Sequence, residues 1–122
     1  MLSKQFRLKK KYQFNYVYRV GKSVGGKLMV LYYCPSKNIN VKVGISVSKK
    51  LGHAVVRNRT KRRIREAIYP HLTTLKPNFN VIVIAKNAIV DASFSDIKSE
   101  LNYLLKKAKI KDNNEKSAKS DN

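Results

Sequence analysis

The stretch from residue 49 to residue 65, KKLGHAVVRNRTKRRIR, constrains the chain most, because it concentrates positive charge that no neighbour in the sequence neutralises. It holds eight Lys or Arg residues in seventeen positions and no acidic residue. Charges this dense repel one another unless an anion covers them, and a phosphate backbone is the natural cover. Ordinary solvated faces usually mix both signs. The stretch therefore predicts a surface that binds a polyanion.

The same stretch reads as a loop that leads into a helix. Gly52 interrupts the strand-like run before it, and from about Val56 to His71 the apolar residues recur at helical spacing. The helix can bury this narrow stripe and still present cations around most of its circumference. The stripe consists of Thr60, Ile64, Ala67, Ile68 and His71, and the cations around it are Arg57, Arg59, Lys61, Arg62, Arg63 and Arg65.

The excess of positive charge is confined to one half of the chain. Residues 1–65 carry eighteen Lys or Arg and no acid, whereas residues 66–122 carry nine basic and seven acidic residues. No apolar run approaches the ~20 residues that span a bilayer, and the basic N-terminus lacks the apolar segment of a secretory signal. Cys34 has no second cysteine to pair with. We therefore expect a cytoplasmic protein that binds RNA or DNA and no membrane.

The 122 residues suffice for one domain, which we expect over residues 1–110, followed by a disordered polar tail over residues 111–122. Residues 1–11 are predicted to be a loosely held basic arm. For residues 12–20, YQFNYVYRV, two periods compete: alternation from Tyr12 to Tyr18 favours a strand, and Phe14, Val17, Tyr18 and Gly21 favour a short helix. The residues alone leave both open.

The remaining pattern predicts strands and helices in alternation. Residues 27–34 and 41–48 read as strands that we expect to form an antiparallel hairpin, with Val41, Val43, Ile45 and Val47 facing one way. The fully apolar run at 80–86 predicts a central strand. Ser93 begins a capping box that opens an amphipathic helix reaching about Lys109. The class is α+β, a small central sheet with helices, in which residues 41–48, 57–71 and 81–86 form a βαβ crossover, right-handed by default.

Catalytic groups are not assembled in this sequence. Three of the seven acids lie in the tail and none falls in the basic half, so clustered carboxylates for metal-assisted hydrolysis are not expected. The two histidines, His53 and His71, do not form a recognisable pair. We expect no catalytic residue and no protein metal site. Phe14, Tyr18 and Tyr32 could stack on RNA bases or could be core residues, and the residues alone favour neither.

The segment Ser46–Arg65 resembles the signature of the bacterial ribonuclease P protein family. Its Arg-Asn-Arg core is flanked by Lys and Arg and is preceded by Ser-Lys-Lys-x-Gly and Ala-Val. The resemblance covers about residues 4–108 and includes the Phe/Tyr-rich segment and the apolar strand ending in Ala85-Lys86. One departure is His53, where the family typically carries Asn.

The resemblance implies an α/β sandwich like that of a ribosomal-protein domain, a left-handed crossover, and a helix at residues 12–20. It implies a role in maturing tRNA 5′ ends, in which a catalytic RNA subunit performs the hydrolysis with Mg²⁺ that it mainly holds itself, without an organic cofactor or an obligate protein partner. A cleft between the first helix and the sheet would hold the single-stranded 5′ leader of precursor tRNA. Leader contacts would be Phe14, Tyr18, Val30, Tyr32 and Lys86. Contacts with the RNA subunit would be Lys49, Lys50, His53, Arg57, Asn58, Arg59, Lys61, Arg62 and Arg65.

Two other functions compete with this one. A structural ribosomal RNA-binding protein would share the charge and size but would not affect tRNA maturation. A stand-alone basic ribonuclease would cleave without an RNA partner, and the missing acid and histidine clusters count against it.

Overall fold

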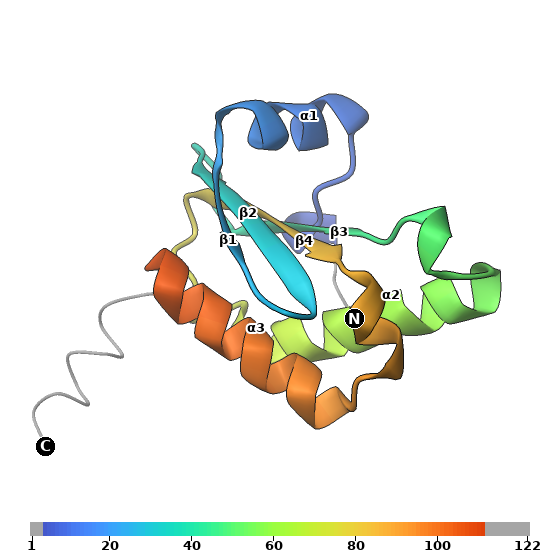
Figure 1. Ribbon diagram of the computed structural model, residues 1–122. Helices are drawn as coiled ribbons and strands as arrows, with labels where there is room; N and C mark the ends of the chain where they lie inside the picture. The colour runs from blue at the N-terminus through green and yellow to red at the C-terminus, as the bar shows by residue number, and fades with distance from the viewer. Residues whose placement is uncertain (1–3, 112–122) are drawn as a thin grey trace, which may run out of the picture.

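The computed structural model describes residues 4–111 (Figure 1). Of the tail predicted at 111–122, Lys111 lies within them and forms an antiparallel bridge with Leu75, and residues 112–122 lie outside them. None of the helices within the described residues is long and apolar enough to cross a membrane. The main elements are α1 (Lys11–Val20), β1 (Lys22–Gly25), β2 (Met29–Pro35), β3 (Lys42–Ser46), α2 (Ala54–Ile68), β4 (Phe79–Ala85) and α3 (Phe94–Ala108). Four short 3₁₀ helices complete them, namely η1 (Lys4–Phe6), η2 (Lys49–Leu51), η3 (Tyr69–His71) and η4 (Asn87–Asp91).

The sheet has four strands in the order β1-β2-β4-β3. β2 is antiparallel to both β1 and β4, whereas β3 is parallel to β4. The predicted hairpin between residues 27–34 and 41–48 is therefore wrong: β4 lies between β2 and β3. β4 is an interior strand of the sheet, as its apolar sequence predicted, because a strand that is apolar on both faces is best buried between two neighbours. The hairpin partner of β2 is β1, a short and largely exposed strand that the sequence analysis did not predict.

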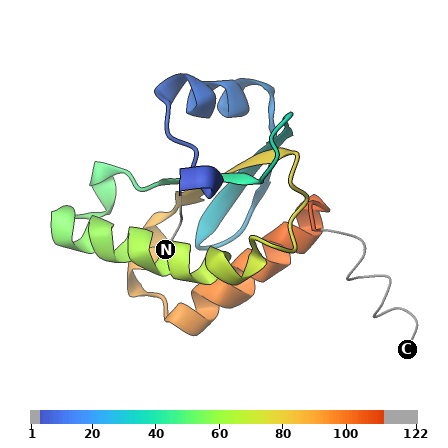
Figure 2. The same ribbon diagram turned by 180° about the vertical axis from the view of Figure 1, so that it is seen from behind.

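The predicted βαβ unit is present, since β3 and β4 are adjacent parallel strands joined through α2. The α+β class is confirmed, and the handedness of the crossover stays a prediction. α1 covers one face of the sheet, and α2 and α3 cover the other, as the two opposite views show (Figures 1 and 2). Two clusters of buried side chains follow from this arrangement, one on each face.

The larger cluster fills the space between the sheet and the pair α2 and α3. It takes alternate residues from the strands, such as Leu31, Val43 and Val83, and the helix stripes that contain Ile64 and Leu101. Val41, Val43, Ile45 and Val47 all belong to this side, as predicted. The smaller cluster lies under α1 and consists of Leu8, Val17, Cys34 and Ile82, with Phe14, Tyr32 and Ile84 packed against it.

Residues 11–20 form a helix, which decides between the two periods that the sequence left open. Val17 is completely buried beneath it, and a strand would have pointed Val17 and Tyr18 to opposite sides. Gly21 ends the helix with an extended backbone, and its N–H donates to the Val17 carbonyl oxygen at 2.8 Å. A side chain at Gly21 would collide with the carbonyl oxygens of Val17 and Tyr33.

The prediction of a loosely held arm is wrong for residues 4–10. The N–H of Leu8 donates to the carbonyl oxygen of Val43 at 3.0 Å, and Arg7 forms a parallel bridge with Val43. Leu8 is buried in the smaller cluster. The segment therefore shields the edge of β3, a contact made mainly through backbone groups that leave little pattern in the sequence.

The basic helix α2 begins two residues earlier than predicted and ends at Ile68. Residues 69–71, which were expected in the last turn, form a 3₁₀ turn because Pro70 has no N–H to continue the α-helical pattern. α3 begins as predicted: the hydroxyl of Ser93 accepts a hydrogen bond from the Asp96 N–H at 3.0 Å.

Candidate nucleic-acid interface

The basic segment, residues 49–65, spans η2 and most of α2, and local hydrogen bonds fix its turn. The Ser48 hydroxyl accepts from the Lys50 N–H at 3.0 Å and so opens η2. Gly52 has a φ of 145°, which only glycine adopts easily. Arg57 Nε donates to the Gly52 carbonyl oxygen at 3.2 Å. The loop and the first turn of α2 are thus tied into one unit.

The cations of α2 point away from the sheet, because its apolar stripe is buried. Thr60, Ile64, Ala67 and Ile68 are the buried residues, as predicted, except that His71 lies beyond the helix. The predicted contacts Lys49, Lys50, His53, Asn58, Arg59 and Arg62 are exposed, and Arg57, Lys61 and Arg65 are partly exposed. All nine lie on this one continuous segment and are available to a polyanion.

Arg63 differs from its neighbours. Its Nη1 donates to the Ala92 carbonyl oxygen at 3.1 Å, in the turn that precedes α3. Arg63 therefore links α2 to the turn before α3.

Three of the predicted leader residues, Phe14, Tyr18 and Tyr32, come together between α1 and the sheet. The rings of Phe14 and Tyr18 lie 6.5 Å apart, and Tyr18 meets Tyr32 edge-on, with ring centres 5.3 Å apart and an angle of 82°. Val30 and Tyr32 lie on the same face of β2, since they are two residues apart. We call these four residues, together with Lys86, the aromatic surface.

The position of Phe14 depends on Gly44 of β3. A Cβ at Gly44 would lie 2.5 Å from Phe14 Cζ, so the ring packs directly on the strand backbone. The sequence could not predict this contact, because a single glycine in an alternating strand does not indicate which side chain packs against it.

Lys86 follows β4, and its ammonium group donates to the Gly26 carbonyl oxygen at 2.8 Å, in the turn between β1 and β2. Glu100 of α3 holds the same turn through the backbone N–H groups of residues 27–29. Glu100 lies within the amphipathic helix predicted after Ser93, and the helical pattern did not indicate this contact. An acid one residue before the buried Leu101 was the only available signal.

The basic segment and Lys86 of the aromatic surface lie at the same end of the sheet. β3 and β4 are parallel and in register from Lys42 and Asn80 to Ser46 and Ile84, so both leave the sheet at the same edge. β3 leads into η2, and β4 leads to Lys86 and η4, which contacts η2.

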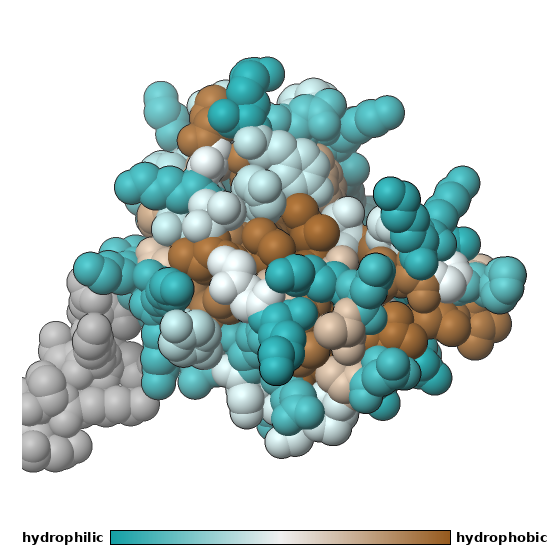
Figure 3. Space-filling view, in the orientation of Figure 1, coloured by the Kyte–Doolittle hydropathy of each residue, from teal (hydrophilic) through white to brown (hydrophobic). Residues whose placement is uncertain are grey.

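Other chemistry is sparse on the described part of the chain. Among residues 4–111, no group of three or more His, Cys, Asp or Glu side chains is placed to hold a metal ion. Burial raises the pKa of the Cys34 thiol. In Figure 3 hydrophilic residues cover most of the visible face, and hydrophobic residues gather mainly in a band below α1.

Comparisons with known proteins agree with this fold. The family model described as Ribonuclease P matches residues 2–109. The "Ribonuclease P protein component" of Staphylococcus carnosus is 44% identical over 110 residues, which are 89% of this chain and 95% of that protein. A Clostridium botulinum protein of the same description is 45% identical over 109 residues, which are 88% of this chain and 97% of that protein.

Solved structures give the same result. The ribonuclease P protein of Staphylococcus aureus superposes with a TM-score of 0.79 at 40% identity, covering 86% of this chain and 96% of that one. That of Thermotoga maritima gives a TM-score of 0.76 at 26% identity, covering 83% and 96%. The fold and its basic, aromatic face are those of a small α+β protein suited to a polyanionic partner. The chain belongs to the ribonuclease P protein family.

Proposed function

We propose that this chain is the protein subunit of ribonuclease P in the cytoplasm and assists the endonucleolytic removal of the 5′ leader from precursor tRNA. The basic segment binds the catalytic RNA subunit, and the aromatic surface binds the single-stranded leader. The catalytic groups and the Mg²⁺ ions reside mainly on the RNA subunit. The observation that carries the proposal is that the basic segment and Lys86 lie at the same end of the sheet, in a chain that belongs to this family.

The chemistry of each surface suits its proposed ligand. Leaders differ in sequence from one tRNA to another, so their binding site should use stacking and charge, which tolerate any base. The Phe14, Tyr18 and Tyr32 rings offer stacking, and Lys86 offers charge. Guanidinium groups along α2 match phosphate oxygens without reading sequence.

Separate surfaces for the leader and for the RNA subunit would have two consequences for the enzyme. Mature tRNA lacks a leader, so a protein that binds the leader makes the complex prefer substrate over product. The cations of residues 1–65 also screen the repulsion between the catalytic RNA and the tRNA. The RNA subunit should therefore need less Mg²⁺ when the protein is present.

The test is cleavage of a 5′-labelled precursor tRNA at low Mg²⁺ by the RNA subunit alone, the protein alone, and the two together. We expect an intact leader to be released only by the mixture. Cleavage by the protein alone would identify a nuclease instead. No stimulation of the RNA subunit would redirect the search to ribosomal RNA as the partner.

The leader assignment has its own test. Replacing Phe14 and Tyr18 by Ala should weaken precursor binding by the assembled enzyme and leave binding of mature tRNA and of the RNA subunit unchanged. Equal losses for precursor and mature tRNA would refute it.

A further inference from the structure

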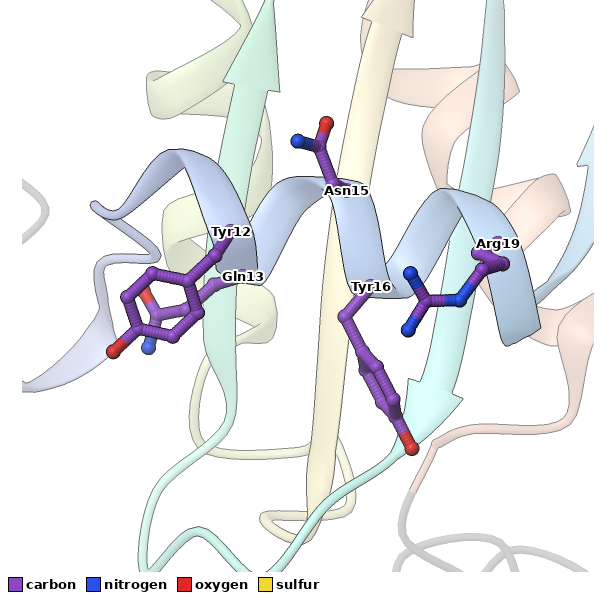
Figure 4. A pocket seen from close by; sticks show the side chains of 5 residues that line it. All are labelled: Tyr12, Gln13, Asn15, Tyr16 and Arg19. Carbon is purple, nitrogen blue, oxygen red and sulfur yellow. The ribbon is translucent and has the colours of Figure 1, made fainter.

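α1 carries a second set of aromatic side chains that the proposed function does not use. Phe14 and Val17 face the sheet, whereas Tyr12, Tyr16 and Arg19 project from the opposite flank of the helix, at i, i+4 and i+7. Tyr12 is 69% exposed and Tyr16 is 49% exposed. Figure 4 shows these side chains along one flank, with the Arg19 guanidinium beside the Tyr16 ring.

The flank is shaped rather than flat. Tyr12, Gln13, Asn15, Tyr16 and Arg19 line a shallow hollow of about 510 Å³ (Figure 4). A second hollow of about 430 Å³ lies between Tyr16 of α1, the end of β2 with the loop that follows it, and the start of β4. Its other lining residues are Pro35, Ser36, Lys37 and Asn80. Tyr16 borders both hollows. We call Tyr12, Tyr16, Arg19 and Lys37 the outer face of α1.

The chemistry of the outer face fits a single-stranded polynucleotide. The Arg19 guanidinium carbon lies 5.6 Å from the centre of the Tyr16 ring, and Tyr16 nevertheless remains 49% exposed. Tyrosine rings stack on bases of any sequence, and neighbouring cations pair with phosphates. No acid occurs anywhere in residues 1–65, so nothing in this part of the sequence repels a phosphate.

A similar pair on α3 lacks this charge complementarity. Tyr103 is 57% exposed, and Lys107 Nζ lies 5.8 Å from the centre of its ring. Its hollow, however, is also lined by the acids Asp96 and Glu100. Of these two exposed tyrosines that lie beside a cation, Tyr103 has acids nearby and Tyr16 has none in its part of the sequence. The outer face of α1 therefore favours a polyanion more than the surface around Tyr103 does. Tyr103 serves as the matched control.

We propose that the outer face of α1 is a second site for single-stranded RNA, in which bases stack on Tyr12 and Tyr16 while Arg19 and Lys37 pair with phosphates. This inference rests on the proposed function, because the ribonuclease P complex would bring single-stranded RNA close to this protein. The strand has two possible sources, upstream nucleotides of a long leader or a single-stranded segment of the RNA subunit, and the chemistry is the same for both.

The first experiment measures binding of the full-length protein to a fluorescent single-stranded uridine 12-mer. The double substitution Tyr12→Ala with Tyr16→Ala should weaken binding about fivefold or more, since even the weaker end of base stacking on an aromatic ring has this effect. Tyr12→Phe with Tyr16→Phe should restore it, because the rings remain. Tyr103→Ala should bind like the unsubstituted protein. Equal affinity of the double Ala variant and the Tyr103→Ala variant would overturn the site.

The second experiment assigns the source of the strand with the assembled enzyme. If it is the leader, the double Ala variant loses affinity for a precursor with a long leader and not for one with a short leader. If it is the RNA subunit, affinity for that subunit falls and both precursors are affected alike. No change in any of these affinities would overturn the proposal.

The outcome is separable from that of the leader assignment. Phe14→Ala with Tyr18→Ala tests the aromatic surface, and the outer-face variants leave those two rings in place. Loss of oligonucleotide binding in the outer-face variants alone would support the second site even if the aromatic surface were found not to bind leaders.

Discussion

The ammonium group of Lys86 donates a hydrogen bond of 2.8 Å to the carbonyl oxygen of Gly26. The turn that contains Gly26 is held from its other side by the Glu100 carboxylate, which accepts from the N–H groups of Lys27, Leu28 and Met29 at 3.0, 2.8 and 2.9 Å. Gly26 is packed against that carboxylate, because a Cβ there would lie 2.5 Å from it. Glu100 thereby fixes the carbonyl group that orients Lys86.

Replacing Glu100 by Ala should destabilise the protein, because three backbone donors lose a charged acceptor. We expect the free energy of unfolding in urea to fall by about 1–3 kcal/mol. Glu66→Ala is the control, since Glu66 is an exposed acid on α2 and surface substitutions usually change stability by less than about 0.5 kcal/mol. Similar losses in the two variants would contradict the role of Glu100.

Gly44→Ala should displace the Phe14 ring from β3. The added methyl group overpacks the site, so we expect a stability loss of about 1–3 kcal/mol, measured by urea unfolding. Under the proposed function, precursor tRNA also binds more weakly. Gly25→Ala is the matched control, because a Cβ there would have only Val30 Cγ2 near it, at 4.0 Å. If Gly44→Ala were as stable as the wild-type protein, the Phe14 ring would not depend on the absence of a side chain at Gly44.

Substitution of neighbouring arginines of α2 should have different effects, on RNA binding for Arg59 and Arg62 and on protein stability for Arg63. Arg59→Ala and Arg62→Ala should leave the urea midpoint unchanged and reduce the salt dependence of binding to the RNA subunit, by a slope of about 0.7–0.9 for each lost phosphate contact. Arg63→Ala should instead lower the free energy of unfolding by about 1–2 kcal/mol, because Arg63 anchors the Ala92 carbonyl group. An unchanged salt slope for both Arg59→Ala and Arg62→Ala would argue against phosphate contacts there.

Cys34 should make the stability of the protein depend on alkaline pH. Burial raises the pKa of its thiol above the usual 9.0. Above about pH 9 the unfolded chain therefore releases this proton while the folded chain retains it, and stability falls as the pH rises. The contribution is complete below that pH.

The measurement is the free energy of unfolding between about pH 8 and 10.5, compared with Cys34→Ala. The decline should be steeper in the protein that has the thiol, and the native thiol should react with a disulfide reagent far more slowly than in urea. Equal slopes and equal reaction rates would exclude this effect of burial.

The sequence predicted those elements in which the order of apolar and polar side chains reflects which side of the element is buried. The stripe of α2, the apolar run of β4 and the Ser93 cap each carry a periodic or positional signal, and each is present in the structure. Strand pairing carries no such signal. The alternation of residues 41–48 specifies which face is buried, and it is the same whether the neighbouring strand is β2 or β4.

Other features were missed because their interactions are made by the backbone or by distant residues. β1 is four residues long and mostly exposed, so its membership in the sheet rests on ladder hydrogen bonds. Tyr12, Phe14, Tyr16 and Tyr18 fit alternation as well as a helix, and only the buried Val17 separates the two. The leader residues were assigned by resemblance to a family, since a stacking ring and a core ring look alike in a sequence.

The central place of β4 also orders events while the chain is being made. β2 and β3 have no strand between them until residues 79–85 have left the ribosome, and by then all eighteen cations of residues 1–65 have emerged. During that interval the nascent polycation has neither its sheet nor its fixed helix faces. The cations of residues 1–65 are thus exposed before the sheet that positions them is complete.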